Sequence, residues 1–199
     1  MLNQMRYHQI PGYDVSFPAI TSLIALYAEY GLINTFIPKS DGRATIGTKT
    51  SQLLDKILKG GHIDDKEWKK LDLKTQNAVM AALRWQKDTG FKSKESESLV
   101  YSLRHGIAGH PDTIGIIRPW WICVIDWKIG DIDNIRVSLQ IPTYGFCYLE
   151  MHPLRRIDGF RAVHLDTEKA TYRERIIPYK EGQYYFDEFI RMKMEVGIL

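Results

Sequence analysis

Apolar side chains in the first half of the chain recur every three to four positions, which is the spacing of helices with one buried face. Residues 1–17, which contain Pro11-Gly12, precede this pattern as an irregular or hairpin segment. Three helices are expected, and their ends are marked by Pro, Gly and capping residues: 18–30, 50–59 and 72–86. A turn-rich stretch over 38–47 separates the first two. Residues 1–90 are therefore predicted to be mainly helical.

The second half changes to short runs of β-branched and aromatic residues separated by Gly and Pro, which is typical of strands. Strands are expected at 99–102, 114–117, 120–125, 162–165 and 173–177, and helices at 139–151 and 185–196. This order favours an α/β fold, with a central mixed β-sheet flanked by helices and a helical N-terminal part. We expect one domain over residues 1–199, with 91–199 as its α/β core.

With 199 residues, of which 44% are hydrophobic and 26% charged, the chain has the composition of one ordinary globular domain. Its longest apolar run, 114–125, is broken by Arg118-Pro119 and is too short for a membrane helix, so no membrane span is expected. The N-terminus has no signal-peptide pattern, and Cys123 and Cys147 are the two cysteines, which favours a reducing cytoplasmic location. A net charge of +3 permits a polyanionic partner without requiring one.

Candidate chemistry concentrates in Gly109-His110-Pro111-Asp112 and in Asp126-Trp127-Lys128 further on. Positions i and i+2 of a strand share a face, so the Asp126 carboxylate and the Lys128 ammonium are expected on one side and Trp127 on the other. If the chain reverses at Arg118-Pro119, Asp112 arrives beside Asp126. Two carboxylates so close need a cation or a shared proton between them, and oxygen ligands suit Mg²⁺ or Mn²⁺.

A divalent ion held in this way suits phosphodiester hydrolysis, because the ion polarises a phosphoryl oxygen and lowers the pKa of a bound water. Lys128 would hold or deprotonate that water and offset the developing negative charge. Glu97 is a candidate third carboxylate; Glu95 is the alternative, although the spacing to Val100 favours Glu97. Taken alone, an Asp-x-Lys strand end is also what a solvent-facing salt bridge produces, and that interpretation stays open for the tripeptide.

Together with their neighbours, these segments resemble the PD-(D/E)XK nucleases, specifically the RecB-like branch that includes the phage lambda-type exonucleases and the CRISPR adaptation nucleases. The similar segments are Pro18-Ala19-Ile20-Thr21, Glu97-Ser98-Leu99-Val100, Gly106-Ile107-Ala108-Gly109-His110-Pro111-Asp112, Val124-Ile125-Asp126-Trp127-Lys128-Ile129-Gly130, and Gln140 with Tyr144. They look like the family's Pro-Ser-Val-Thr, Glu-x-x-Val, Gly-x-Ala-Gly-x-x-Asp, Val-Ile-Asp-x-Lys-Thr-Gly and Gln-x-x-x-Tyr motifs. The resemblance covers most of the chain and implies a restriction-endonuclease-like core over 91–199.

The resemblance also implies a set of site residues. Asp112 and Asp126 would be metal ligands together with the backbone carbonyl of Trp127, and Lys128 would be the catalytic lysine. Glu97 would support the metal site. Two further residues, Gln140 and Tyr144, would line the cleft near the DNA, one helical turn apart. Pro142 lies between them, which is compatible with a helix that starts at about Ser138.

The basic stretch that contains Arg155 and Arg156 is the densest in the chain, and it is expected either to follow a phosphate backbone or to form a plain solvated surface. Trp120, Trp121 and Trp127 are candidates for stacking on bases, but in so apolar a strand at least some of them are expected to pack in the core. His110 is a candidate DNA contact, although a structural role is the more common one for an isolated histidine.

Two departures from the family pattern affect the cofactor expected. Many RecB-like members carry a metal-binding His in a Gly-Thr-x-x-His segment, whereas Gly47-Thr48-Lys49-Thr50 is followed here by Ser51. The expected ion is therefore Mg²⁺, with Mn²⁺ as a substitute rather than a strong preference. The CRISPR adaptation nucleases hold an iron–sulfur cluster with four cysteines, and with Cys123 and Cys147 alone no such cluster is expected.

The resemblance implies a Mg²⁺-dependent deoxyribonuclease, and phage-type motifs in a small chain favour an exonuclease that resects DNA ends for recombination or replication in the host cytoplasm. DNA is the expected partner, beside a single-strand annealing recombination protein and a homo-oligomer, a trimer if the chain is lambda-like, with a monomer as the alternative. Two other functions stay open. One is a structure-specific or nicking endonuclease of the same fold. The other is a non-catalytic DNA-binding or virion protein that retains the fold.

Overall fold

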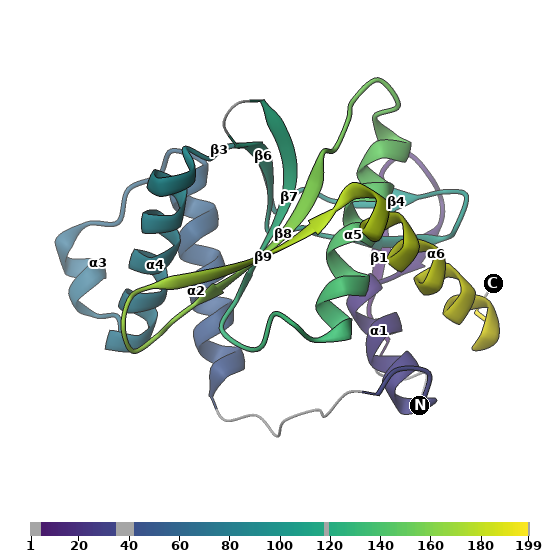
Figure 1. The fold of residues 1–199 in the computed structure, drawn as a ribbon, viewed down its shortest axis with the longest axis horizontal. Helices are drawn as coiled ribbons and strands as arrows, with labels where there is room; N and C mark the ends of the chain where they lie inside the picture. Colours follow the sequence, from purple (N-terminus) through teal and green to yellow (C-terminus); the bar gives the residue numbers. More distant parts are fainter. Residues whose placement is uncertain (1–4, 35–41, 118–119, 199) are drawn as a thin grey trace.

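The computed structural model describes residues 5–34, 42–117 and 120–198, and a twisted β-sheet runs through its centre (Figure 1). The sheet has five strands in the order β3-β6-β7-β8-β9. Their bounds are Lys92–Ser96, Thr113–Ile117, Trp121–Lys128, Gly159–Leu165 and Tyr172–Pro178. β7 and β8 are parallel, whereas the other neighbours are antiparallel, so the sheet is mixed. The predicted α/β fold with a central mixed sheet is confirmed.

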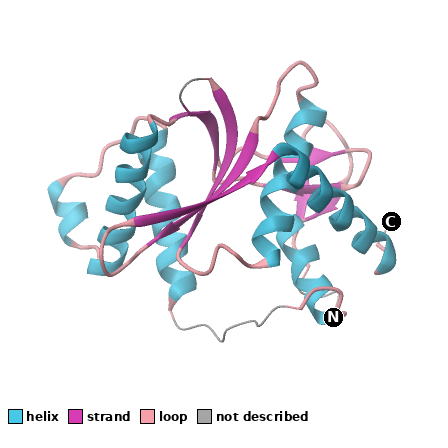
Figure 2. Ribbon diagram, in the orientation of Figure 1, coloured by secondary structure: helices cyan, strands magenta, loops and turns pink. Residues whose placement is uncertain are grey.

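Helices cover both faces of this sheet (Figure 2). On one side lie α1 (Ile20–Glu29), α5 (Ile135–Met151) and α6 (Tyr179–Glu195); on the other lie α2 (Arg43–Leu58) and α4 (Leu73–Thr89), with the short α3 (Asp65–Lys69) between them in sequence. Successive side chains of β7 point to opposite faces of the sheet, and both faces are apolar. Val124 packs against the α5 side, whereas Cys123 and Ile125 pack against the α4 side, so helices cover both faces. The helical N-terminal part therefore contributes to both layers.

Two small two-stranded sheets complete the fold beside α5. β1 (Tyr7–Gln9) and β2 (Ser16–Pro18) form the N-terminal hairpin that was one of the two expectations for this segment. β4 (Val100–Ser102) pairs with β5 (Ile107–Gly109), so the expected strand at 99–102 exists but lies outside the central sheet. An isolated bridge between Ala19 and Ala108 joins the start of α1 to β5.

Several helices start earlier than predicted, because polar residues hide the apolar spacing at their first turns. α2 begins at Arg43 rather than at Thr50, and Thr50 lies buried inside it. α5 begins at Ile135, where the Asn134 side chain caps the helix by accepting a hydrogen bond from the Arg136 N–H, and α6 begins directly after Pro178. The expected third helix is confirmed in α4, which Asp72 caps through the Thr75 N–H.

The early start of α5 overturns the expectation for Pro142. That residue lies in the helix interior and not next to an uncapped first turn, so the Ser138 carbonyl one turn earlier receives no backbone hydrogen bond from it. The sequence reading also missed β3, whose residues Lys92–Ser96 are mostly polar and lack the β-branched composition expected of a strand.

The expected chain reversal at Arg118-Pro119 and the first part of the turn-rich stretch 38–47 lie outside the described residues. The rest of that stretch, from Arg43 on, forms the start of α2 and not a turn. β6 and β7, the strands on either side of Arg118-Pro119, pair antiparallel as a hairpin requires, from Thr113 opposite Ile125 to Ile117 opposite Trp121. Within the described ranges, none of the helices has the length and apolar character needed to cross a membrane.

Candidate functional site

Asp126 and Lys128 lie on the same face of β7, as the sequence predicted, and this face is the one that α5 covers. The Asp126 side chain is buried, with the residue 2% exposed, and the Lys128 ammonium forms an ion pair with its Oδ2 atom. Trp127 points to the opposite face, where its indole meets the Trp85 ring edge-on at 5.3 Å between centroids. Strand alternation thus places the Asp126–Lys128 ion pair on one face of β7 and the Trp127–Trp85 contact, which holds the strand in place, on the other.

Asp112 lies at this site because it directly precedes β6, and the first residue of β6, Thr113, lies opposite Ile125, three residues before β7 ends. The β6–β7 pairing stops at Thr113 opposite Ile125, so the Trp127 N–H has no strand partner on that side. The Asp112 carboxylate takes the partner's place and accepts the Trp127 N–H through Oδ2 at 2.6 Å. Since the N–H and C=O groups of a strand residue point to the same edge, the Trp127 carbonyl is directed to the side of Asp112.

The carboxyl group of Asp112 is buried beside the Asp126 charge, and both conditions disfavour its charged form. Burial is the main cause that raises the pKa of Asp112 well above its usual value, and the nearby Asp126 charge raises it further, against the opposing effects of Lys128 and the Trp127 N–H. Burial alone would lower the pKa of Lys128, but Asp126 and Asp112 outweigh it, so the pKa of Lys128 is raised. The lysine is therefore held as an ammonium ion between two acids.

Gln140 on α5 connects the charged groups to one another. Its Nε2 donates to Asp126 Oδ1 at 3.2 Å, and its Oε1 accepts from Lys128 Nζ at 3.3 Å. The same Nε2 lies 3.1 Å from the hydroxyl oxygen of Tyr144, one helical turn later, and Tyr144 in turn packs against Gly109, where a Cβ would collide with its ring. Gln140 and Tyr144 therefore lie where the motif resemblance expected them, on the side of α5 that faces the acids.

The alternatives Glu95 and Glu97 lie on different sides. Glu95 accepts a hydrogen bond from the Tyr148 hydroxyl at 3.1 Å, away from Asp112. Glu97 adopts a left-handed backbone conformation with φ of 51° and donates its N–H to the Asp112 carbonyl at 3.2 Å. Burial raises the pKa of Glu97, and the charges of Asp55 and Asp126 add to the effect. The geometry thus places Glu97 in the electrostatic surroundings of the site, as the spacing to Val100 favoured.

An open hollow of about 340 Å³ gives access to these groups. The β-strand side contributes Asp112, Asp126 and Lys128, and α2 contributes Ala44, Gly47 and Ser51. Ser51 is the residue that stands where many RecB-like nucleases carry histidine, so its position in the hollow agrees with the alignment of motifs inferred from the sequence.

Sequence reasoning gave little weight to His110 and none to Asp55. His110 lines the same hollow, and its Nδ1 lies 2.9 Å from the Glu97 carbonyl; since a carbonyl only accepts, Nδ1 donates. The Asp55 Oδ1 accepts from the Ser96 hydroxyl, which also lies 3.1 Å from the Asp112 carbonyl. Asp55 belongs to the part of α2 that the sequence predicted, but no motif connected it to β3.

The donor set fits a hard divalent ion with few protein ligands. In the described part of the chain, no three His, Cys, Asp or Glu side chains lie close enough together to hold a metal ion. Asp126 Oδ2 is nevertheless buried without a hydrogen bond of regular geometry, and one ammonium leaves the two acids with an excess negative charge. Mg²⁺ is commonly bound by one or two carboxylates and several waters, so Asp112, Asp126 and the Trp127 carbonyl suit it.

Arg155 and Arg156, which were expected either to bind DNA at the cleft or to form a plain solvated surface, do not line this hollow. They lie in the loop between α5 and β8, where Arg156 Nη2 donates to the Trp120 carbonyl at 3.2 Å. Trp121 begins β7 five residues before Asp126, so at a rise of about 3.3 Å per residue these two residues are about 17 Å apart along the strand. Of the three tryptophans, Trp127 packs in the core as expected of some of them, whereas the Trp120 and Trp121 side chains are exposed.

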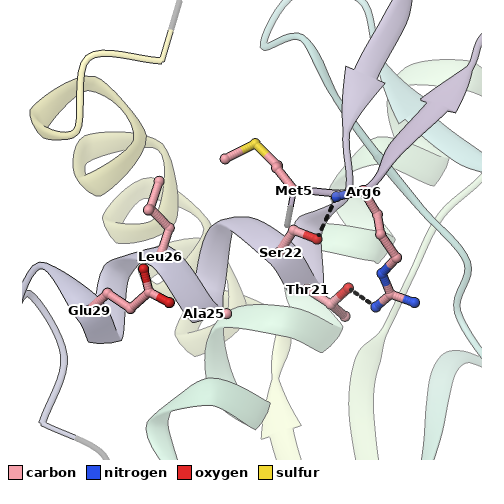
Figure 3. Close-up of a pocket in the computed structure, with 7 residues that line it drawn as sticks. All are labelled: Met5, Arg6, Thr21, Ser22, Ala25, Leu26 and Glu29. Atoms are coloured by element: carbon pink, nitrogen blue, oxygen red, sulfur yellow. Dashed lines mark hydrogen bonds between the residues drawn. The ribbon is translucent and has the colours of Figure 1, made fainter. Parts of the chain in front are cut away.

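A second hollow lies beside α1, away from the acids (Figure 3). Arg6 reaches into it and donates through Nη2 to the Thr21 hydroxyl at 3.2 Å, while the Arg6 N–H donates to the Ser22 hydroxyl. Thr21 ends the Pro18-to-Thr21 segment of the motif resemblance. The other residues expected at the site lie outside this hollow.

Comparisons with known proteins find similarity to solved structures. No protein-family model matches the sequence, and no curated protein is similar to it. The fold is similar to the crystal structure of an alkaline exonuclease from Laribacter hongkongensis, with a TM-score of 0.38 and 14% sequence identity over 89% of this chain and 88% of that one. A TM-score and an identity this low do not assign a function.

Proposed function

We propose that residues 1–199 form a single metal-dependent DNA nuclease domain that cuts phosphodiester bonds at the hollow between β7, α2 and α5. The observation that carries this proposal is the convergence of Asp112, Asp126 and Lys128 at the end of β7, where two buried carboxylates surround one ammonium ion. Folding alone gives no reason to bury these charges together, since a buried ion pair is seldom more stable than apolar residues of the same volume.

Each residue has a separate task in this proposal. Asp112 and Asp126 would hold Mg²⁺ together with the Trp127 carbonyl, and Mn²⁺ has the same ligand preference. When bound, the ion polarises the phosphoryl oxygen and lowers the pKa of a coordinated water. Lys128, released from its ion pair with Asp126, would orient the attacking water and offset the charge that develops on the phosphate.

The remaining residues position these groups. Gln140 fixes the rotamers of Asp126 and Lys128 by bonding both, and Tyr144 holds the Gln140 amide from the next turn of α5. Glu97 adds negative charge next to Asp112 and so favours the bound cation. DNA would enter through the open hollow on the side of Gly47 and Ser51, which are small enough to leave room for a sugar–phosphate backbone.

Within this class we propose an exonuclease that resects DNA ends for phage-type recombination or replication. The support is the motif resemblance to the lambda-type branch, together with Ser51 in the hollow in place of an imidazole. The same resemblance supports a homo-oligomer, a trimer if the chain is lambda-like, and a single-strand annealing protein as a partner. It also supports the expectation that the chain holds no iron–sulfur cluster.

The test uses end-labelled linear DNA and covalently closed circular DNA, each incubated with Mg²⁺, with Mn²⁺ and with EDTA. We expect loss of linear DNA alone, dependence on the metal, and no cleavage by Lys128→Ala. Lys74→Ala is the matched control, because Lys74 pairs with Glu168 on the exposed side of α4. Cleavage of both substrates would indicate an endonuclease instead, and binding without metal-dependent cleavage would indicate a non-catalytic DNA-binding or virion protein.

A further inference from the structure

The backbone of Asp112 lies just beyond the strand pairing of the central sheet. The β3–β6 pairing stops at Ser96 opposite Thr113, and the β6–β7 pairing stops at Thr113 opposite Ile125. Asp112 precedes Thr113, so the regular ladder hydrogen bonds of the sheet do not fix it on either side. Its position therefore depends on hydrogen bonds outside the ladders.

Ser96 and Glu97, at the end of β3, hold the Asp112 carbonyl. The Glu97 N–H donates to it at 3.2 Å, and the Ser96 hydroxyl oxygen lies 3.1 Å from it. Ser96 is buried, so its hydroxyl needs a partner within the chain. The shorter contact of that hydroxyl is the one to Asp55 Oδ1 at 2.8 Å, and the charge on the carboxylate makes it the stronger acceptor. Asp55 therefore sets the direction of the Ser96 hydroxyl next to Asp112.

Asp55 lies on the face of α2 that lines the hollow. Gly47, Ser51 and Asp55 follow one another at intervals of four residues, so they share one side of the helix, and the first two line the hollow. Lys59, one turn after Asp55, forms an ion pair with its Oδ1 atom at 2.8 Å. The Asp55 side chain is 25% exposed. This carboxylate is thus held from its own helix, and it joins the hollow-lining face of α2 to the end of β3.

We propose that Asp55 is a positioning residue for the metal site. Through Ser96 it fixes the backbone of Asp112, and with it the distance between that acid and the face of α2 that lines the hollow. This role rests on the proposed function, because it takes Asp112 to be a metal ligand. Groups that hold a metal ligand in place typically contribute about 10–100-fold to metal affinity, since a ligand already in position loses less freedom when the cation binds.

Asp55 also brings a negative charge toward the acids, and this effect can be separated from the hydrogen bond. After burial, the charge of Asp55 is the largest cause that raises the pKa of Glu97. Asp55→Asn removes the charge but keeps an oxygen that accepts from the Ser96 hydroxyl, whereas Asp55→Ala removes both. An effect of charge would therefore appear in both variants, and an effect of position in Asp55→Ala alone.

The test measures Mn²⁺ binding to the full chain, freed of metal with EDTA, from the electron paramagnetic resonance signal of the free ion. We expect Asp55→Ala and Ser96→Ala each to weaken Mn²⁺ affinity about tenfold, and Asp55→Asn to retain most of it. The double alanine variant should bind no more weakly than either single variant, because two residues that act as one unit are not additive. Glu67→Ala, which breaks an exposed ion pair between α3 and Lys56 of α2, is the matched control and should bind normally.

Three results would overturn this role while the proposed function stands, with the unchanged chain still binding Mn²⁺ and cutting DNA. They are unchanged affinity in Asp55→Ala, an equal loss in Asp55→Asn, and additive losses in the double variant. The second would assign the effect to charge, and the third would show that Asp55 and Ser96 act separately. An unchanged chain that neither binds Mn²⁺ nor cuts DNA would overturn the proposed function as well. If Asp55→Ala does not fold, Ser96→Ala, which removes one oxygen atom, gives the same comparison.

Discussion

The Gln140 amide lies between Asp126 and Lys128, with its Nε2 atom 3.2 Å from Asp126 Oδ1 and its Oε1 atom 3.3 Å from Lys128 Nζ. One side chain of α5 thus bonds both charged groups of β7. The Gln140 amide nitrogen donates to the Asp126 carboxylate, and its amide oxygen accepts from the Lys128 ammonium. These two bonds fix the orientation of the amide. A glutamate at this position would have no donor for Asp126 and would add a third negative charge.

We expect Gln140→Ala to lower kcat about tenfold while DNA binding changes little. The loss of a hydrogen bond to a charged group is worth about 1.5–3 kcal/mol, and about 1.4 kcal/mol corresponds to one factor of ten. Steady-state kinetics on end-labelled DNA, with affinity measured separately in Ca²⁺, checks this. Gln86→Ala on α4 is the control. Unchanged kcat in Gln140→Ala would show that the amide does not position the site.

Asp112→Asn should stabilise the metal-free protein and remove stabilisation by Mg²⁺. The amide removes a charge whose burial is the main cause, and whose repulsion by Asp126 is the second cause, of the raised pKa of Asp112, and the amide oxygen can still accept from the Trp127 N–H. We expect a gain of about 1 kcal/mol in the free energy of unfolding without metal. Thermal denaturation with EDTA and with Mg²⁺ measures both effects, and Asp131→Asn, in an exposed loop, is the control. A less stable metal-free Asp112→Asn would contradict the prediction.

Gly182→Ala should destabilise the fold because α6 touches the sheet there. An added Cβ would overlap the ring of Phe160 on β8, a residue with no exposed surface. Overpacking of this kind costs about 1–3 kcal/mol. Gly130→Ala, where a Cβ meets nothing within 4 Å, should stay within about 0.5 kcal/mol. Urea denaturation of the two variants would refute the close approach if it gave equal midpoints.

Glu174→Ala should lower the free energy of unfolding more than Glu168→Ala does. Glu174 Oε2 accepts from the Trp85 indole at 2.8 Å and from Arg161 at 2.7 Å, so its removal leaves a buried guanidinium without its ion pair. Breaking a buried pair costs about 3–5 kcal/mol, and the partial exposure of Glu174 places the expected loss nearer to 2–3 kcal/mol. Glu168→Ala, which breaks an exposed pair with Lys74, should cost under about 1 kcal/mol. Melting curves of the two variants decide the comparison.

The sequence predicted the apolar strands β6 and β7 and the faces of Asp126 and Lys128, because strand alternation is a local property. Asp126, Lys128 and Trp127 separate onto two faces by geometry alone, and the apolar β6 and β7 are visible in composition. What the sequence could not show depends on contacts between distant segments. The polar β3 becomes a strand because its backbone pairs with β6, and α2 starts at Arg43 although its first turn lacks an apolar stripe.

The sequence left open for a similar reason whether Arg155 and Arg156 follow a phosphate backbone or form a plain solvated surface. A basic stretch in the sequence shows charge, but the end of the sheet at which it lies depends on the length and direction of α5. His110 shows the opposite case, because its residue type was noticed while its contact with the Glu97 carbonyl depends on the turn between β5 and β6. Residues on the apolar strands were thus predictable, whereas the end of the sheet at which Arg155 and Arg156 lie was not.

The bond between the Trp127 N–H and Asp112 links the pairing of two strands to their chemistry. A slip of one residue between β6 and β7 would turn Trp127 toward α5 and place the acid and the ammonium of β7 under α4, among apolar residues. Such a misaligned hairpin would lose stability and reactivity in the same step. Misaligned copies of this chain would therefore be unable to bring Asp112, Asp126 and Lys128 together in one hollow.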